Sequence, residues 1–288
     1  FQPHRISRVI NLKKEFSKCF KMADIVLLCP IYTANEKIKL NFTYHSFAKS
    51  IIKNSNVRLI QVEDELQLRK FVKQNVFGEK IYIGMGAGSI YSTLGGTHQS
   101  IEDISIASSI PNMNVLAPCD PLEMKEATTW CATKNNGPVY MRLGKVGEPV
   151  LTDKAIDSFK FGKIRYLSKG REIAILSYGV TTKIANELHN ELKKRGQNNS
   201  LISCHTLKPL DINGIKNVLN NHKKIIVIEE HVPHGGLSSR VKEIAQDFRI
   251  NKDIKCFTLK DKFFHFYGSH DQLLDMHGLS LKKILKKI

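Results

Sequence analysis

The sequence predicts an α/β protein with two doubly wound, mostly parallel-sheet domains. Short apolar runs of strand length alternate with segments of helical periodicity along nearly the whole chain. This alternation is typical of parallel sheets that helices cover on both faces. The length agrees, because 288 residues with 42% hydrophobic side chains are enough for about two domains with cores of their own.

The first third of the chain has three apolar runs with the length of strands, at 24–29, 57–62 and 80–84. Pro30 ends the first run, and apolar residues at helical spacing predict a helix over 64–76 between the second and the third. The run Gly84-Met-Gly-Ala-Gly88 then predicts a tight turn, because glycine adopts positive φ freely. It does not complete GxGxxG, so a dinucleotide site there is the less favoured alternative.

The rest of the chain continues the alternation of strands and helices. Strands are predicted at 114–117, 139–143, 172–177, 200–203, 224–228 and 254–259. Helices are predicted at 121–133, 180–195, 211–221 and 236–248. A final helix over 281–288 has its apolar residues at i, i+3, i+4 and i+7, so one face docks while the lysines stay in solvent. Gly, Pro and charged residues at 144–169 mark the best domain boundary.

Composition excludes several classes of function. The net charge is +17, but lysine is spread along the whole chain, so we predict solvated helix faces and no nucleic-acid partner. No apolar run approaches the ~20 residues of a membrane span, so no membrane partner is expected. The six cysteines form no CxxC pair and no zinc-type cluster with histidine. This pattern predicts reduced thiols, a cytoplasmic location and no metal site.

Two motifs upstream of the glycine run are typical of a ligase. Phe1-Gln-Pro-His-Arg-Ile-Ser-Arg8 and Pro30-Ile-Tyr-Thr-Ala-Asn-Glu36 resemble FQPHRxxR and a YxAxE loop in the C-terminal domain of UDP-N-acetylmuramate–alanine ligase, an enzyme of peptidoglycan synthesis. The resemblance covers about the first 90 residues and implies that His4, Arg5 and Arg8 are remnants of its ligand site. If the resemblance is set aside, the alternative is that Arg5 and Arg8 are ordinary exposed residues at the start of a helix. The P-loop that such a ligase needs for ATP occurs nowhere in this chain.

The motifs downstream of the glycine run belong to a different pattern. They are Gly95-Gly-Thr-His-Gln99, Ile110-Pro-Asn-Met113, Pro118-Cys-Asp-Pro121, Gly137-Pro-Val-Tyr-Met-Arg-Leu-Gly144, Leu207-Lys-Pro-Leu-Asp211, Glu229-Glu-His231, Gly235-Gly-Leu237 and Gly268-Ser-His270. In this order they resemble the pyrimidine-binding domain and the C-terminal domain of the transketolase family, over about 200 residues. The resemblance implies thiamine diphosphate with Mg²⁺ as cofactor and a sugar phosphate as substrate.

The transketolase resemblance also implies roles for single residues. His98 matches a histidine that hydrogen-bonds sugar hydroxyls and moves protons at the carbonyl, as an imidazole can near neutral pH. Gln99 beside it and Arg142 are implied to bind substrate, Arg142 through the phosphate. The alternative for Arg142 is a salt bridge to Asp103 or Asp120. Glu229-Glu-His231 is predicted to pack at an interface and to take no part in catalysis.

Together the two resemblances predict a chimera whose family changes at the glycine run. Its parts are a ligase-like segment at 1–90, a partial pyrimidine-domain segment at 84–150 that shares one α/β domain and one sheet with it, and a transketolase C-terminal domain at 165–288. The family's aminopyrimidine-binding glutamate and its GDG…N magnesium motif have no match, so the cofactor-binding residues stay unknown. The favoured function is a C-terminal transketolase subunit or fragment, inactive alone, that pairs with a diphosphate-binding subunit or with a second copy. A ligase fragment and a non-catalytic interaction module are the alternatives.

Overall fold

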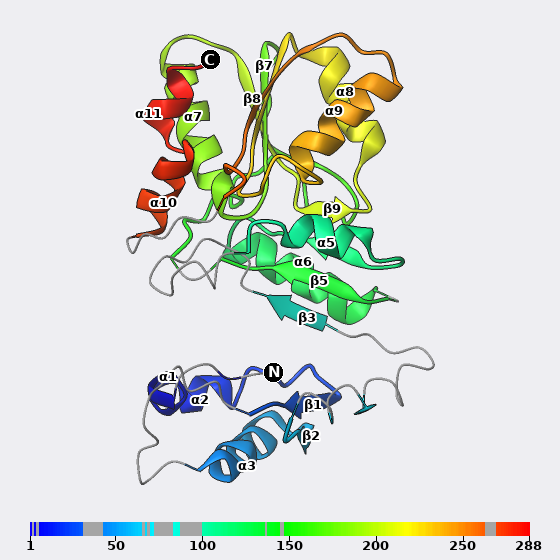
Figure 1. Cartoon of the computed structure of the whole chain (residues 1–288), viewed down its shortest axis with the longest axis vertical. Coiled ribbons are helices and arrows are strands. Elements are labelled where there is room, and N and C mark those ends of the chain that lie inside the picture. Colours follow the sequence, from blue (N-terminus) through cyan, green and yellow to red (C-terminus); the bar gives the residue numbers. More distant parts are fainter. Residues whose placement is uncertain are drawn as a thin grey trace. The chain divides into compact units, whose positions relative to one another are not determined.

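The computed structural model describes residues 1, 3, 6–30, 43–64, 67, 70–71, 83–86, 100–135, 137–144, 147–262 and 269–288, with backbone alone at 6–8 and 83–86. The chain divides into two compact units, Phe1–Lys80 and Ile81–Ile288 (Figure 1). Each is described by itself.

The first unit is built around a small parallel sheet. Its elements are α1 (Ile6–Asn11), α2 (Lys13–Phe16), β1 (Ile25–Leu28), α3 (Tyr44–Ser55) and β2 (Arg58–Gln61). β1 and β2 pair in parallel. Thr43 caps α3, because its side chain accepts a hydrogen bond from the Ser46 amide at 3.1 Å. The buried Phe47 and Ile51 of α3 pack with Val26 and Leu28 of β1 in the core of this unit.

The second unit contains two sheets, of which the smaller has four strands in the order β3-β5-β4-β9. They are β3 (Ile83–Gly86), β4 (Asn114–Leu116), β5 (Val139–Arg142) and β9 (Thr206–Lys208). The first three are parallel, and β9 is antiparallel to β4. Val115 on one face of the sheet shares a core with α5 (Asp103–Ser109), whereas Leu116 on the other face packs against α6 (Pro121–Thr133). Successive side chains of a strand point to opposite faces, so the two helices cover opposite sides of this sheet.

The larger sheet has five strands in the order β11-β10-β7-β8-β6. Its strands are β6 (Arg165–Ser168), β7 (Ile173–Ser177), β8 (Asn199–Ser203), β10 (Lys224–Ile228) and β11 (Asp253–Phe257). Its helices are η3 (Gly179–Thr181), α7 (Thr182–Lys194), α8 (Ile212–Asn221), α9 (Leu237–Asp247), α10 (His270–His277) and α11 (Leu281–Leu285). All neighbouring strands run parallel except β6, which is antiparallel to β8.

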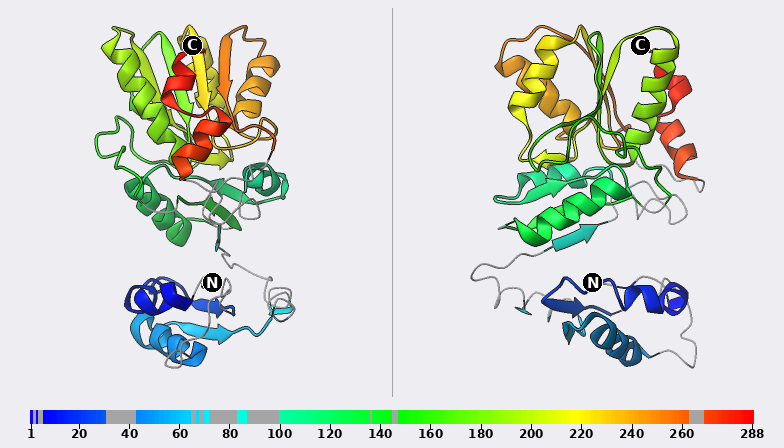
Figure 2. Two further views of the ribbon diagram at one scale, coloured as in Figure 1. Left: turned by 60° about the vertical axis from the view of Figure 1, so that its left-hand side comes forward. Right: turned by 180° about the vertical axis from the view of Figure 1, so that it is seen from behind.

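Strict alternation along the central strands of this sheet creates two cores. In β7, Ala174 and Leu176 belong to the core under α8 and α9, whereas Ile175 belongs to the core under α7, α10 and α11. Figure 2 shows these two groups of helices on opposite faces of the sheet. Strands that are buried on both faces need side chains that are apolar throughout, which explains the runs Ile173-Ala-Ile-Leu176 and Ile225-Ile-Val-Ile228.

The expected α/β class with parallel-rich sheets is confirmed. Most expected strands and helices lie within a few residues of their predicted places, and α6 and β10 have the predicted bounds. The expected helix over 64–76 falls largely outside the described residues. The docking of the final helix is confirmed, because Ile284 is fully buried, although the helix ends at Leu285.

The expectation of one sheet through residues 24–145 holds only in part for the described strands. β1 and β2 pair only with each other, whereas β3 pairs with β5. Two edge strands, β6 and β9, were not expected at all. Each has only three or four residues and runs antiparallel to its neighbour, so neither leaves an apolar run long enough to be recognised in the sequence.

Candidate functional site

Polar side chains gather in the second unit where strands β5, β7 and β10 reach their carboxyl ends. Arg142 is the last residue of β5, Tyr178 directly follows β7, and Glu229 and Glu230 directly follow β10. All four side chains are buried. In open parallel sheets, ligand sites form at this edge.

Arg142 is the centre of this cluster and is only 5% exposed. Its Nη1 donates to the Glu230 carbonyl at 2.6 Å, and its Nη2 donates to the Ser100 carbonyl at 3.0 Å. The same Nη2 lies 3.4 Å from Asp103 Oδ1. Burial lowers the pKa of Arg142, but the charges of Asp103 and Glu230 outweigh this and raise it. Arg142 is therefore a fixed, buried cation that bridges three segments of chain.

Asp103 is held from a second side by Tyr140, whose hydroxyl donates to Asp103 Oδ2 at 2.5 Å. Burial, and after it the charge of Asp103, raises the pKa of Tyr140 well above its usual range. The phenol therefore stays protonated and keeps its role as donor. The sequence left Asp103 and Asp120 as alternative salt-bridge partners of Arg142, and in the structure the partner is Asp103. Asp120 instead caps α6 by accepting from the Glu123 amide at 2.7 Å.

The three residues Glu229-Glu-His231 make different contacts from one loop. Glu229 accepts hydrogen bonds from the Leu237 and Ser238 amides at the start of α9, at 2.8 and 2.9 Å. Glu230 Oε1 contacts His270 Nε2 at 2.7 Å, and His231 Nε2 accepts from the Ser105 amide at 3.3 Å. The motif thus fastens α5, α9 and α10 to one strand end, which agrees with the packing role predicted for it.

Gly235 and Gly236 bring this loop into close contact with its neighbours. A Cβ on Gly235, which has φ +74°, would lie 2.5 Å from Ser105 Cβ. A Cβ on Gly236 would lie 2.4 Å from Glu229 Oε2. The two positions therefore need glycine because of close approach, and at Gly235 also because of the positive φ.

Of the substrate residues implied by resemblance, only Arg142 has a described side chain. His98, Gln99, His4 and Arg5 lie outside the described residues, and Arg8 is described only as backbone in α1. Ser100 directly follows Gln99 in the sequence, and its carbonyl accepts from Arg142. The arginine predicted to bind substrate thus holds the chain two residues after His98.

His270, Tyr140 and Tyr178 belong to the cluster but were not predicted as members. Tyr178 is buried and donates to Glu229 Oε2 at 3.1 Å. Burial, followed by the charge of Glu229, raises its pKa well above the usual range. Two of the three lie in motifs that the sequence shows, His270 at the end of Gly268-Ser-His270 and Tyr140 within Gly137–Gly144. The described residues contain no group of three His, Cys, Asp or Glu side chains that could hold a metal ion, and no helix long and apolar enough to cross a membrane.

Two family models match the second unit and part of the first. The model of the transketolase pyrimidine-binding domain matches residues 42–146, and that of the transketolase C-terminal domain matches residues 162–284. The chain belongs to the transketolase family. The Arg142 cluster lies where these two transketolase domains meet, because Asp103, Tyr140 and Arg142 come from the first and Glu229, Glu230 and His270 from the second.

Curated relatives agree with the family models. The chain is 31% identical over 248 residues to 1-deoxy-D-xylulose-5-phosphate synthase of Dictyoglomus turgidum, which is 84% of this chain and 40% of that protein. It is also 68% identical over 90 residues to UDP-N-acetylmuramate–L-alanine ligase of Pelagibacter ubique, which is 31% of this chain and 19% of that protein. The chain thus spans less than half the length of either relative. This pair of matches fits the predicted chimera.

A solved structure titled "Split gene transketolase, inactive beta4 tetramer" shares the fold. It superposes with a TM-score of 0.71 at 21% identity and covers 97% of this chain and 94% of that one. The pyrimidine-domain match begins at residue 42, upstream of the glycine run at 84–88 where we expected the family to change. The place of that change stays a prediction.

Proposed function

We propose that this transketolase-family chain is the C-terminal subunit or fragment of a thiamine-diphosphate-dependent transferase that makes or remodels sugar phosphates. The observation that carries the proposal is the Arg142 cluster, which joins the pyrimidine-domain segment to the C-terminal domain through buried, charge-assisted hydrogen bonds. An intact junction of this kind keeps residues of both domains at one strand edge.

In this proposal, His98 acts on the sugar carbonyl and Gln99 binds beside it, in the segment that Arg142 holds at Ser100. Arg142 itself would have to exchange the Glu230 or Ser100 carbonyl for a substrate phosphate in order to bind it. Its present contacts favour a positioning role. Thiamine diphosphate would supply the carbanion chemistry of the reaction.

The described residues do not fit the cofactor's diphosphate and metal by themselves. They contain no metal-ligating group of three side chains, and the GDG…N motif does not occur in the sequence. We therefore infer that the chain needs a diphosphate-binding subunit, or a second copy of itself, as partner. A cytoplasmic location, and the absence of nucleic acid and membrane partners, belong to the same proposal.

Calorimetric titration tests this proposal directly. The chain alone should show no measurable binding of thiamine diphosphate with Mg²⁺, whereas a mixture with the diphosphate-binding subunit of a split transketolase should bind it. Micromolar binding by the lone chain would contradict the proposed division of labour. Failure of the mixture to bind, although the two chains associate, would favour the alternative of a non-catalytic interaction module.

A second candidate function follows from the curated relatives. A relative that matches 84% of this chain is named 1-deoxy-D-xylulose-5-phosphate synthase. 1-Deoxy-D-xylulose 5-phosphate is therefore a candidate product, beside the sugar phosphates that ketol transfer would form. Mass spectrometry of the sugar phosphates formed by the mixture separates the two. The remaining alternative, a ligase fragment of peptidoglycan synthesis, predicts instead that the chain binds the amino-acid substrate of that ligase.

A further inference from the structure

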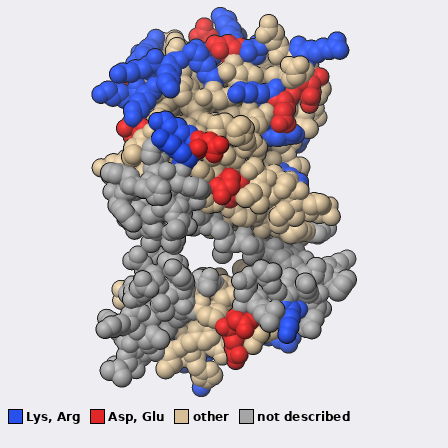
Figure 3. Space-filling model, viewed as in Figure 1, with Lys and Arg blue, Asp and Glu red and all other residues tan. Residues whose placement is uncertain are grey.

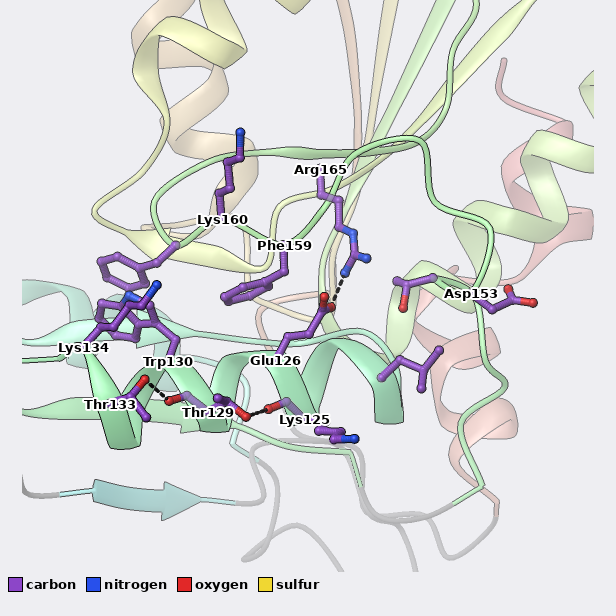
Figure 4. A pocket seen from close by; sticks show the side chains of 13 residues that line it. Lys125, Glu126, Thr129, Trp130, Thr133, Lys134, Asp153, Phe159, Lys160 and Arg165 are labelled. Carbon is purple, nitrogen blue, oxygen red and sulfur yellow. Dashed lines mark hydrogen bonds and ion pairs between the residues drawn. The ribbon is translucent and has the colours of Figure 1, made fainter. Parts of the chain in front are cut away.

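A pocket of about 760 Å³ lies apart from the Arg142 cluster, between helix α6 and the segment that leads into β6 (Figure 4). Its lining includes the aromatic side chains Trp130, Phe159 and Phe161 and the lysines at 125, 134 and 160. This volume is within the range of pockets that hold small molecules. None of its lining residues belongs to the site proposed above.

The aromatic side of the pocket is held in place by stacking. Trp130 and Phe161 stack with ring centroids 3.5 Å apart and planes 10° from parallel. Phe159 stacks at 4.3 Å on His205, which is fully buried. Aromatic rings that are ordered in this way offer a flat apolar surface at a low entropic cost to a ligand.

The lysines supply positive charge that no acid of the described chain neutralises. Lys125, Lys134 and Lys160 are exposed and form no ion pair with any described residue. Glu126, by contrast, is already engaged by Arg165 Nη1 at 2.7 Å. Asp153 lies at the end of the pocket away from Lys134 and Trp130 in Figure 4. The aromatic end therefore attracts anions.

The pocket hydroxyls are committed to the helix. Thr129 Oγ1 donates to the Lys125 carbonyl at 2.8 Å, and Thr133 Oγ1 donates to the Thr129 carbonyl at 2.7 Å. The ammonium groups are thus the charged donors that remain for a ligand along this face of α6. Lysine ammoniums bind phosphate as point charges.

We propose that this pocket binds a small anion that carries a flat heteroaromatic ring, of the nucleoside-phosphate class. The ring packs against the aromatic side chains, and the phosphate lies between Lys134 and Lys160. Neither half of the ligand binds tightly by itself. Inorganic phosphate contacts the lysines but not the aromatic surface, and an uncharged nucleoside contacts the aromatic surface without pairing with the lysines. The proposal does not depend on the transferase reaction.

Trp130 is the only tryptophan in the chain, so its emission reports on this pocket. The full chain is titrated with AMP, inorganic phosphate and adenosine, and each binding constant is confirmed by calorimetry. AMP should change the Trp130 emission saturably and bind at least about tenfold more tightly than either fragment. Equal binding of AMP and phosphate, or no binding of AMP, would overturn the proposal.

A matched pair of double variants tests the role of the two lysines. The variant Lys134→Ala/Lys160→Ala should weaken AMP binding about tenfold, because two exposed charge pairs are lost. The variant Lys193→Ala/Lys194→Ala removes the same charge from exposed positions on α7 and should leave the affinity unchanged. Equal loss in both variants would mean that only the net charge attracts AMP, and the pocket would then not be the site. All four lysines are exposed, so the unfolding midpoints of both variants should match that of the wild type.

Discussion

Arg142 Nη1 donates a hydrogen bond of 2.6 Å to the backbone carbonyl of Glu230, 88 residues further along the chain. This contact joins the end of β5 in the smaller sheet to the end of β10 in the larger one. Because an arginine at this point reaches two carbonyls and a carboxylate at once, one side chain ties the two transketolase domains together.

Replacement of Arg142 should therefore be costly. Arg142→Ala leaves Asp103 as a buried charge without its cation, so the free energy of unfolding should fall by about 3–5 kcal/mol. The measurement is urea unfolding of the full chain, followed by the emission of Trp130. Arg171→Ala, at an exposed arginine, serves as the control and should change stability little. If the free energy of unfolding of Arg142→Ala fell by less than about 1 kcal/mol, Arg142 would not hold the two transketolase domains together.

Gly236 should not tolerate a methyl group. In Gly236→Ala the new Cβ would lie 2.4 Å from Glu229 Oε2, so either the α9 start or the Glu229 carboxylate must move. We expect a loss of about 1–3 kcal/mol by the same unfolding measurement. Gly137→Ala is the matched control, because its nearest neighbour would lie 3.4 Å away, in ordinary contact. Equal stability of the two variants would refute the argument.

His205 should make the protein less stable in acid. Burial, and after it the charge of Arg165, lowers the pKa of His205 to about 3, whereas in the unfolded chain it titrates near its usual 6.5. As the pH falls below 6.5, His205 becomes protonated in the unfolded state but stays neutral in the folded state. Stability should therefore fall by up to about 1.4 kcal/mol per pH unit. Between pH 6.5 and pH 5, the free energy of unfolding should depend less steeply on pH in His205→Gln than in the wild type. An equal dependence in both proteins would contradict this prediction.

His270 should act in the opposite direction. Burial lowers its pKa, but the hydrogen bond and charge of Glu230 outweigh this, so the pKa of His270 is raised above 6.5. Its stabilising contribution is fully present below 6.5 and is lost as the pH rises through the raised value. The stability advantage of the wild type over His270→Gln should therefore shrink from pH 6 to pH 8.5. His234→Gln, at an exposed histidine, is the control for the substitution itself and should change stability little.

The distribution of charge also agrees with expectations from the sequence. Figure 3 shows Lys and Arg of the second unit mixed with Asp and Glu on the face in view. Several lysines of the second unit form surface ion pairs, such as Lys283 with Asp275 at 2.7 Å and Lys223 with Glu172 at 3.6 Å. Exposed pairs of this kind contribute little to stability, so they mainly show that the lysines occupy solvated faces.

The sequence by itself determined the α/β class, most of the buried strands and the approximate bounds of α6, α7, α8 and α9, because alternation of apolar runs and helical periods is a local property. It did not predict α3, α5 or α10. The run Lys224-Ile-Ile-Val-Ile228 is short and β-branched, which indicates a strand buried on both faces. Asp120-Pro121 indicates a helix start, because Asp is a good N-cap and Pro is favoured at the first helical position.

Tertiary structure alone decided which polar residues meet. From the sequence, Asp103 and Asp120 are equally good salt-bridge partners for Arg142. In the structure, Asp120 caps α6 and accepts from the Leu151 and Thr152 amides. Asp103 is the carboxylate that pairs with Arg142. The edge strands β6 and β9, the junction at Glu230 and the pocket beside Trp130 all depend on contacts between segments far apart in the chain. Such contacts follow from how sheets and helices pack, which no local pattern of residues encodes.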